Sequence, residues 1–141
     1  MPWLVDGRNL LGAMRVDRHA DDAKRFLAGR LAAFARAKRT RVTLFFDGAE
    51  PPHFARHLGG CTVVFSAPRS ADDLIVERCG GRGVTVVTSD RSLANRVEGR
   101  HVKVVAAAKF AVELERAEAD QQGSDGDWEA WFADPKNRGD F

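Results

Sequence analysis

In the stretch Trp3-Leu4-Val5-Asp6-Gly7-Arg8-Asn9-Leu10 (WLVDGRNL), a short apolar run ends in a carboxylate, a glycine and an asparagine. A run that is apolar throughout, rather than alternating, is typical of a strand buried on both faces in a parallel sheet covered by helices. The same pattern returns in VTLFFDG, which ends at Asp47-Gly48, and in VTVVTSD, which ends at Asp90. Three predicted strands therefore end at an acidic residue or within two residues of one.

The rest of the chain alternates between strand-like and helical patterns. The predicted strands are Trp3–Asp6, Val42–Asp47, Thr62–Phe65, Val84–Thr88 and Val102–Val105. The predicted helices are Asp21–Lys38, Ala71–Cys79, Ser92–Val97 and Ala107–Ala119, and the first of them carries an apolar stripe of Phe26, Leu27, Leu31, Phe34 and Ala35. This alternation predicts an α/β fold, a three-layer α/β/α sandwich with a mainly parallel sheet of about five strands.

The 141 residues are sufficient for one domain with a substantial core. We expect that domain to span residues 1–119, and residues 120–141 to form an acidic, loose C-terminal tail with a short helix around Trp128–Ala133. The segment Ala49–Gly60 opens with two prolines and closes with two glycines, so it is predicted to be a loop that holds at most one helical turn.

Charge is distributed unevenly along the chain. Residues 1–112 carry 19 Lys and Arg against 11 Asp and Glu, whereas residues 113–141 carry 3 against 9. A basic body favours a polyanionic partner, with which the acidic tail would compete. The alternative is that an arginine-rich chain reflects only the base composition of its genome, since 17 of the 22 basic residues are Arg.

Composition also limits the class of protein. No apolar stretch approaches the ~20 residues that span a bilayer, and no signal peptide is recognisable, so we expect a cytoplasmic protein without membrane contact. Cys61 and Cys79 lack the spacing of a metal or redox motif and are expected to be small buried hydrophobic residues.

Acidic residues at the carboxyl ends of the strands predict a site. In open parallel sheets, ligands bind at this edge, where Asp6, Asp47 and Asp90 fall. Ser70 is a predicted N-cap, which places Asp72 and Asp73 in the first turn of a helix that begins at the same edge. Carboxylates that converge repel one another unless a cation neutralises them, and an all-oxygen site suits Mg²⁺ or Mn²⁺ rather than zinc. Beside a basic surface, such an ion indicates phosphodiester chemistry.

Each aspartate also has a purely structural interpretation. Asp6-Gly7 and Asp47-Gly48 are common turn pairs. Asp90 could only cap the helix that follows it, Asp72 could only complement the helix dipole, and Asp73 could complete a capping box with Ser70. The convergence of all five at one edge favours the metal site over these separate explanations.

Four motifs in order, LVDGRNLLGA, VTLFFDG, VVFSAPRSADDLIVE and VTVVTSDRSLANRV, resemble a YacP-like NYN domain of the PIN-like nuclease superfamily over about Trp3 to Leu114. The resemblance implies a Rossmann-like fold and a metal-dependent ribonuclease. It assigns catalytic positions to Asp6, Asn9, Asp72 and Asp90, with Asp6, Asp72 and Asp90 as metal ligands and Asp47 and Asp73 as further acidic positions.

Substrate-binding candidates lie beside these motifs at the same edge. They are Arg8, Arg15, Arg69, Arg91 and the hydroxyl of Ser89. Arg8 departs from the family, because relatives often carry an aromatic or another bulky residue there. Thr88 is expected to satisfy backbone groups at its strand end. Side chains on an ordinary solvated face would give the same sequence pattern.

The leading hypothesis is a Mg²⁺- or Mn²⁺-dependent ribonuclease, with an endonuclease favoured, in which water attacks a phosphodiester in line. A second hypothesis is a non-catalytic RNA- or ribosome-binding module with the same fold. A haloacid dehalogenase-type phosphohydrolase also begins with a strand-end Asp, but it needs a second Asp where Arg8 stands. The sequence leaves open whether the RNA is ribosome-associated mRNA or a structured RNA, whether one or two metal ions bind, and whether the protein is a homodimer.

Overall fold

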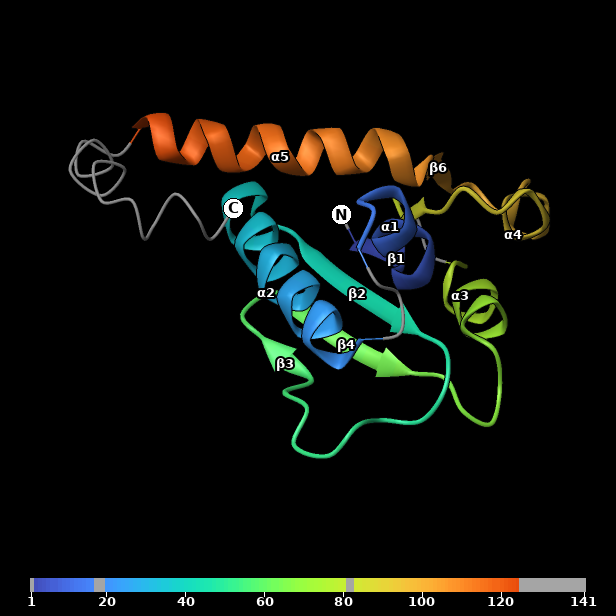
Figure 1. Ribbon diagram of the computed structural model, residues 1–141. Coiled ribbons are helices and arrows are strands. Elements are labelled where there is room, and N and C mark those ends of the chain that lie inside the picture. The colour runs from blue at the N-terminus through green and yellow to red at the C-terminus, as the bar shows by residue number, and fades with distance from the viewer. Residues whose placement is uncertain (1, 17–19, 81–82, 125–141) are drawn as a thin grey trace.

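The computed structural model describes residues 2–16, 20–80 and 83–124 as a mixed α/β fold around one sheet (Figure 1). The strands are β1 (Pro2–Asp6), β2 (Arg41–Phe46), β3 (His57–Leu58), β4 (Cys61–Phe65), β5 (Thr85–Val87) and β6 (Lys103–Val105). They form a six-stranded sheet in the order β3-β4-β2-β1-β5-β6. Every pairing is parallel except that of β3 with β4, so the predicted parallel sheet is confirmed.

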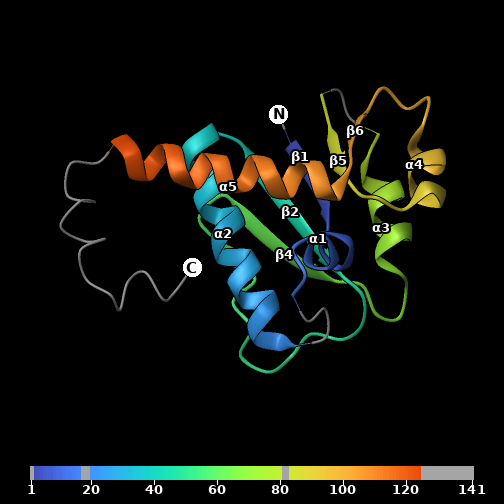
Figure 2. The same ribbon diagram turned by 45° about the horizontal axis from the view of Figure 1, so that its top comes forward.

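Five helices cover the two faces of this sheet. They are α1 (Gly7–Ala13), α2 (Asp21–Lys38), α3 (Ala71–Arg78), α4 (Arg91–Val97) and α5 (Ala107–Ser124). One core cluster joins α1, α2 and α5 to residues such as Val5, and the other joins α3 and α4 to residues such as Leu4. Figure 2 shows α5 crossing α2 and α1, with α3 and α4 beside β5 and β6. Neighbouring residues of β1 therefore point into different cores, which explains its apolar sequence.

The order of the strands places a topological switch point between β1 and β5. From β1 the chain moves to β2 and β4 on one side, and it then returns to β5 and β6 on the other side. Because crossovers between parallel strands are right-handed, this reversal puts α3 and α4 on the face opposite to α1 and α2. Ligands of open α/β sheets bind outside the carboxyl ends of the strands at such a point.

Two elements escape the sequence prediction. Helix α1 begins directly at Gly7, where β1 ends, because Asp6 is both the last residue of the strand and the N-cap of the helix. A Cβ at Gly7 would lie 2.8 Å from the carbonyl oxygen of Phe45, so glycine permits a close approach to β2. Strand β3 has only two residues and lies in the segment predicted to be a loop.

Two further expectations change in detail. The sequence predicts Phe26 on the apolar stripe of α2, but this residue is 48% exposed and its ring lies beside the Arg30 guanidinium. Helix α5 continues to Ser124, past the predicted end at Ala119. The domain boundary at residue 119 stays a prediction, and the helix expected around Trp128–Ala133 lies outside the described residues. Within the described ranges, none of the helices combines the length and apolar character needed to cross a bilayer.

Candidate metal and phosphodiester site

A cleft of about 660 Å³ opens at the carboxyl edge of the sheet, beside the switch point. Six of the residues predicted for the site line it together. They are Asp6, Arg8, Asn9, Asp47, Asp72 and Asp90, and they are joined by Lys24, Phe46 and Ser70. The four carboxylates come from the ends of β1 and β2 and from the N-termini of α3 and α4. The structure thus brings together side chains that are far apart in the sequence.

Asp6 lies deepest, with only 3% of its surface exposed. Its carboxylate accepts a bond from the Asn9 backbone N–H at 3.4 Å, and a second from the Asn9 side-chain Nδ2 at 2.8 Å. The Thr88 hydroxyl Oγ1 donates a third bond to Asp6 Oδ2 at 3.1 Å. The carboxylate is therefore held in one orientation by the helix that follows β1 and by the end of β5.

Asn9 and Thr88 connect Asp6 to the loop after β5. Asn9 Oδ1 accepts a bond from the Ser89 backbone N–H at 3.1 Å, and Thr88 Oγ1 accepts one from the Asp90 backbone N–H at 3.1 Å. Asp90 in turn caps α4, because its Oδ1 accepts bonds from the N–H groups of Ser92 and Leu93. The sequence predicts that the Thr88 hydroxyl satisfies backbone groups, and in the structure it also donates a bond to the buried Asp6 carboxylate.

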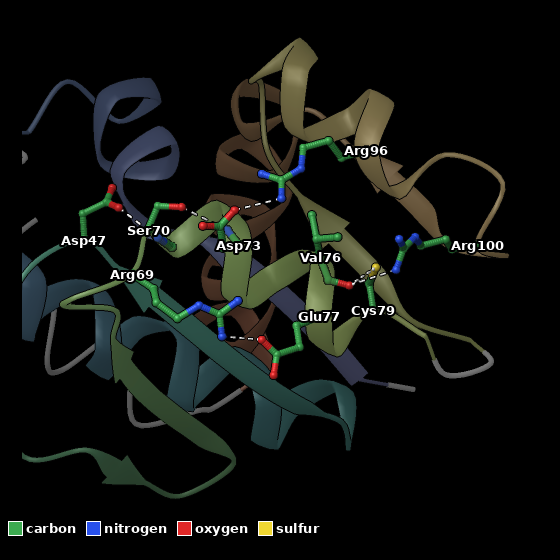
Figure 3. A network of polar contacts seen from close by, with 10 residues as sticks. Asp47, Arg69, Ser70, Asp73, Val76, Glu77, Cys79, Arg96 and Arg100 are labelled. Atoms are coloured by element: carbon green, nitrogen blue, oxygen red, sulfur yellow. Dashed lines mark hydrogen bonds and ion pairs between the residues drawn. The ribbon is translucent and has the colours of Figure 1, made fainter.

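Asp47 is connected to the start of α3. Its Oδ1 accepts a bond from the Ala71 backbone N–H at 2.9 Å, and Figure 3 shows it facing that first turn. Ser70 is the N-cap of α3, as predicted, with its Oγ accepting a bond from the Asp73 N–H at 3.2 Å. These two contacts fix the turn that carries Asp72 into the cleft.

Asp73 and Arg69 have other partners and do not line the cleft. Asp73 Oδ1 pairs with Arg96 Nη2 of α4 at 2.8 Å, and Arg69 pairs with Glu77 of α3 (Figure 3). The pair of Asp73 and Arg96 links the two helices that present Asp72 and Asp90. The Arg96 guanidinium lowers the pKa of Asp73 through a hydrogen bond, and the Ser70 hydrogen bond lowers it further.

The remaining substrate-binding candidates divide in the same way. Arg8 is exposed and lines the cleft. Ser89 Oγ instead accepts a bond from the Ala107 backbone N–H at 2.9 Å, at the start of α5. Arg91 is an exposed first residue of α4, and Arg15 is an exposed residue with a φ of 59° after α1; neither lines the cleft.

The carboxylates of the cleft interact electrostatically. Burial raises the pKa of Asp6 to about 6, opposed by its hydrogen bonds from Asn9 and Thr88 and increased by the charges of Asp72 and Asp47. The pKa of Asp72 is also raised, first by burial and then by Asp90 and Asp47, while Arg96 acts in the opposite direction. The neighbouring carboxylates therefore make the ionised forms of Asp6 and Asp72 less favourable, which is the situation that a bound cation relieves.

The donor atoms fit a hard divalent ion. Carboxylate oxygens and the Asn9 amide are the ligands that Mg²⁺ and Mn²⁺ prefer, and the site has no thiolate or imidazole. Across residues 2–16, 20–80 and 83–124, however, no three His, Cys, Asp or Glu side chains stand close enough together to hold an ion. Because these carboxylates do not yet stand close enough together, metal binding would require some of them, such as Asp90 at the N-cap of α4, to rotate toward the ion.

Lys24 and Phe46 are the cleft residues that the sequence interpretation missed. Lys24 lies in the first turn of α2, and its ammonium Nζ stands 5.7 Å from the centre of the Phe46 ring. No spacing in the sequence connects Lys24 to the acidic motifs. The signal that could have found it is its position at the start of a helix that begins near the carboxyl edge of the sheet.

The fold is a mostly parallel, three-layer α/β sandwich with acidic residues at the carboxyl edge of its sheet, the arrangement expected of a PIN-like domain. The chain belongs to the YacP-like NYN domain family, whose model matches residues 3–130. NYN domains are PIN-like, nuclease-type domains.

Solved structures give the same fold. The crystal structure of Rae1 (YacP) from Bacillus subtilis is 22% identical, with a TM-score of 0.74, covering 86% of this chain and 78% of that chain. Its W164L mutant is 24% identical, with a TM-score of 0.71, covering 86% of this chain and 80% of that chain. A search of curated proteins gave no match.

Proposed function

We propose that this protein is a divalent-metal-dependent ribonuclease that hydrolyses RNA phosphodiester bonds. The observation that carries the proposal is the single cleft beside the switch point that Asp6, Asp47, Asp72 and Asp90 line together. Support comes from the family, whose members act on RNA and generally use divalent ions. The cleft also carries two cations, Arg8 and Lys24, on the same surface as the carboxylates.

In this proposal, Asp6, Asp72 and Asp90 hold Mg²⁺ or Mn²⁺, with Asp47 as a further oxygen donor. The ion, when bound, supplies a Lewis acid for the phosphate oxygens and lowers the pKa of the attacking water. Asn9 and Thr88 keep the Asp6 carboxylate oriented, so Asn9 is a positioning residue for the buried ligand. Arg8 is exposed at the cleft and would bind a phosphate of the RNA strand.

A second candidate is a non-catalytic RNA-binding module. It is favoured by the finding that, in the part of the chain the structure describes, the carboxylates do not already form a compact three-ligand group. The two candidate functions differ in whether a bound metal ion is required for activity. A ribonuclease needs an ion in the cleft for turnover, whereas a binding module retains RNA affinity when the carboxylates are neutralised.

The test compares the wild type with Asp72→Asn and with a control, Asp73→Asn, on single-stranded and structured RNA in Mg²⁺, Mn²⁺ or chelator. Asp72 lines the cleft, whereas its neighbour Asp73 pairs with Arg96 outside it. We expect cleavage by the wild type and by Asp73→Asn in metal, no cleavage in chelator, and a loss of at least about a hundredfold in Asp72→Asn. Cleavage that survives in chelator, or equal rates in all three proteins, would exclude the proposed mechanism. RNA binding without cleavage would support the module.

A further inference from the structure

Lys24 is a cation whose placement the acidic motifs do not explain. Its side chain is only 15% exposed, although lysine is among the residues least often buried without a partner. Its ammonium Nζ lies 5.7 Å from the centre of the Phe46 ring and 6.0 Å from that of Phe65. The aliphatic part of the side chain is thus covered, and the charge is fixed at the wall of the cleft.

The ion pair that Lys24 makes within its own helix is weak. Its Nζ stands 3.9 Å from Asp21 Oδ1, which is at the limit of an ion pair, and the Asp21 side chain is 49% exposed. A pair of this kind, three residues apart on a helix, contributes only a few tenths of a kcal/mol to stability. The Lys24 ammonium can therefore leave Asp21 and bind a phosphate oxygen with a loss of only a few tenths of a kcal/mol of stability.

The charge balance of the cleft indicates why a phosphate group of RNA would need Lys24 there. The four carboxylates that line the cleft carry a formal charge of about −4, and one divalent ion reduces it to about −2. Arg8 and Lys24 supply the remaining two positive charges. Together, the ion and these two cations bring the cleft to neutrality. A phosphodiester, which carries one negative charge, would otherwise be repelled by the residues that are to bind the ion.

We propose that Lys24 forms a phosphate subsite of the cleft, in which its ammonium binds a non-bridging oxygen of the RNA backbone beside the Phe46 wall. The proposal rests on the proposed ribonuclease function and names a substrate contact within it. Lysine binds phosphate as a point charge, so the subsite reads the backbone and not the base sequence. The two aromatic rings hold the charge in place before RNA arrives.

The variants are chosen to remove the charge and keep the packing. Lys24→Met retains an unbranched apolar side chain against Phe46 and Phe65, and Lys24→Arg restores a cation. Lys38→Met is the matched control, because Lys38 is exposed in the last turn of the same helix. Fourteen residues of helix separate the two lysines, which corresponds to about 21 Å.

Steady-state cleavage of a labelled single-stranded RNA of mixed sequence is measured in Mn²⁺ at several salt concentrations. We expect Lys24→Met to raise KM about tenfold and to reduce the salt dependence of log KM by about 0.7, the value for one lost phosphate contact to a single strand. Lys24→Arg should recover most of the affinity, and Lys38→Met should resemble the wild type. The dissociation constant for Mn²⁺, measured by titration with the metal alone, should be the same in all four proteins.

Three outcomes would overturn the subsite. The first is a wild type that cleaves RNA while Lys24→Met matches Lys38→Met in KM and in salt dependence. The second is a change in Mn²⁺ affinity with unchanged RNA affinity, which would make Lys24 a counter-charge for the carboxylates. The third is a wild type that fails to cleave any RNA in Mn²⁺ or Mg²⁺, and this outcome alone refutes the ribonuclease function as well.

Discussion

Replacing Asp6 with Asn should change how the stability of the folded protein depends on pH. Burial and neighbouring carboxylates raise the pKa of Asp6 from 3.8 to about 6. The folded protein therefore retains a proton that the unfolded chain releases between those two values. Stability should fall as the pH rises through this window, because the unfolded state then binds fewer protons than the native state.

The size of the effect follows from the shift. A change of about 2 pKa units corresponds to about 3 kcal/mol at 1.36 kcal/mol per unit. We expect the free energy of unfolding of the wild type to lose up to this amount between pH 4 and pH 7, relative to Asp6→Asn, which does not titrate. The amide keeps the shape of the carboxylate, although it cannot accept all of the bonds from Asn9 and Thr88.

The assay is urea unfolding of both proteins in chelator at intervals from pH 4 to pH 7, which gives the free energy of unfolding at each pH. Asp73→Asn serves as the control. The pKa of Asp73 is lowered by Arg96 and Ser70, so its contribution is lost only as the pH falls below the ordinary carboxyl range. Parallel pH profiles for the wild type and Asp6→Asn would refute the argument that Asp6 is buried among other charges.

Three more predictions follow from single contacts. Gly7→Ala should destabilise the fold by about 1–3 kcal/mol in urea unfolding, because the new methyl group meets β2. The control Gly29→Ala, which has open space around it, should be neutral or stabilising. Equal effects of the two substitutions would contradict the close approach of Gly7 to β2. Thr88→Val should cost about 1–3 kcal/mol by removing the buried hydroxyl between Asp6 and Asp90, and a neutral result would show that this link is unimportant. Mn²⁺ at about a hundred times its dissociation constant should stabilise the wild type by about 2.7 kcal/mol in thermal unfolding but should have little effect on Asp72→Asn, and an equal gain in both would place the ion elsewhere.

The sequence was sufficient for the parallel strands and for the placement of the acidic residues at their carboxyl ends, since both depend on short-range patterns. Strand β1 is apolar at consecutive positions because Leu4 and Val5 enter different cores, and this pattern predicts a parallel sheet. Cys61 and Cys79 are both buried, as expected. Ser70 caps α3, so the placement of Asp72 at the edge could be derived from its distance to the cap.

The features that sequence reasoning missed depend on contacts between distant segments. Helix α1 begins without a loop because Asp6 caps it directly, and the close approach of Gly7 to Phe45 and Phe46 of β2 leaves room for no other residue; no local pattern shows this approach. Asp72 faces the cleft, whereas Asp73 pairs with Arg96 of α4, and this contact between two helices is not visible in the local sequence. Lys24 enters the cleft only because Phe46 and Phe65, at the ends of β2 and β4, form the surface on which it lies.

In the proposed site, Asp6, Asp72 and Asp90 bind a shared divalent ion, with Asp47 as a further oxygen donor. The most direct measurement is anomalous diffraction from crystals of the protein grown or soaked in Mn²⁺. We predict an anomalous peak within the cleft, with oxygen atoms of Asp6, Asp72 and Asp90 as its protein ligands and with the Asp90 side chain rotated away from α4. A cleft without a peak at saturating Mn²⁺, or a peak bound only by residues outside the cleft, would contradict a shared metal site in the cleft.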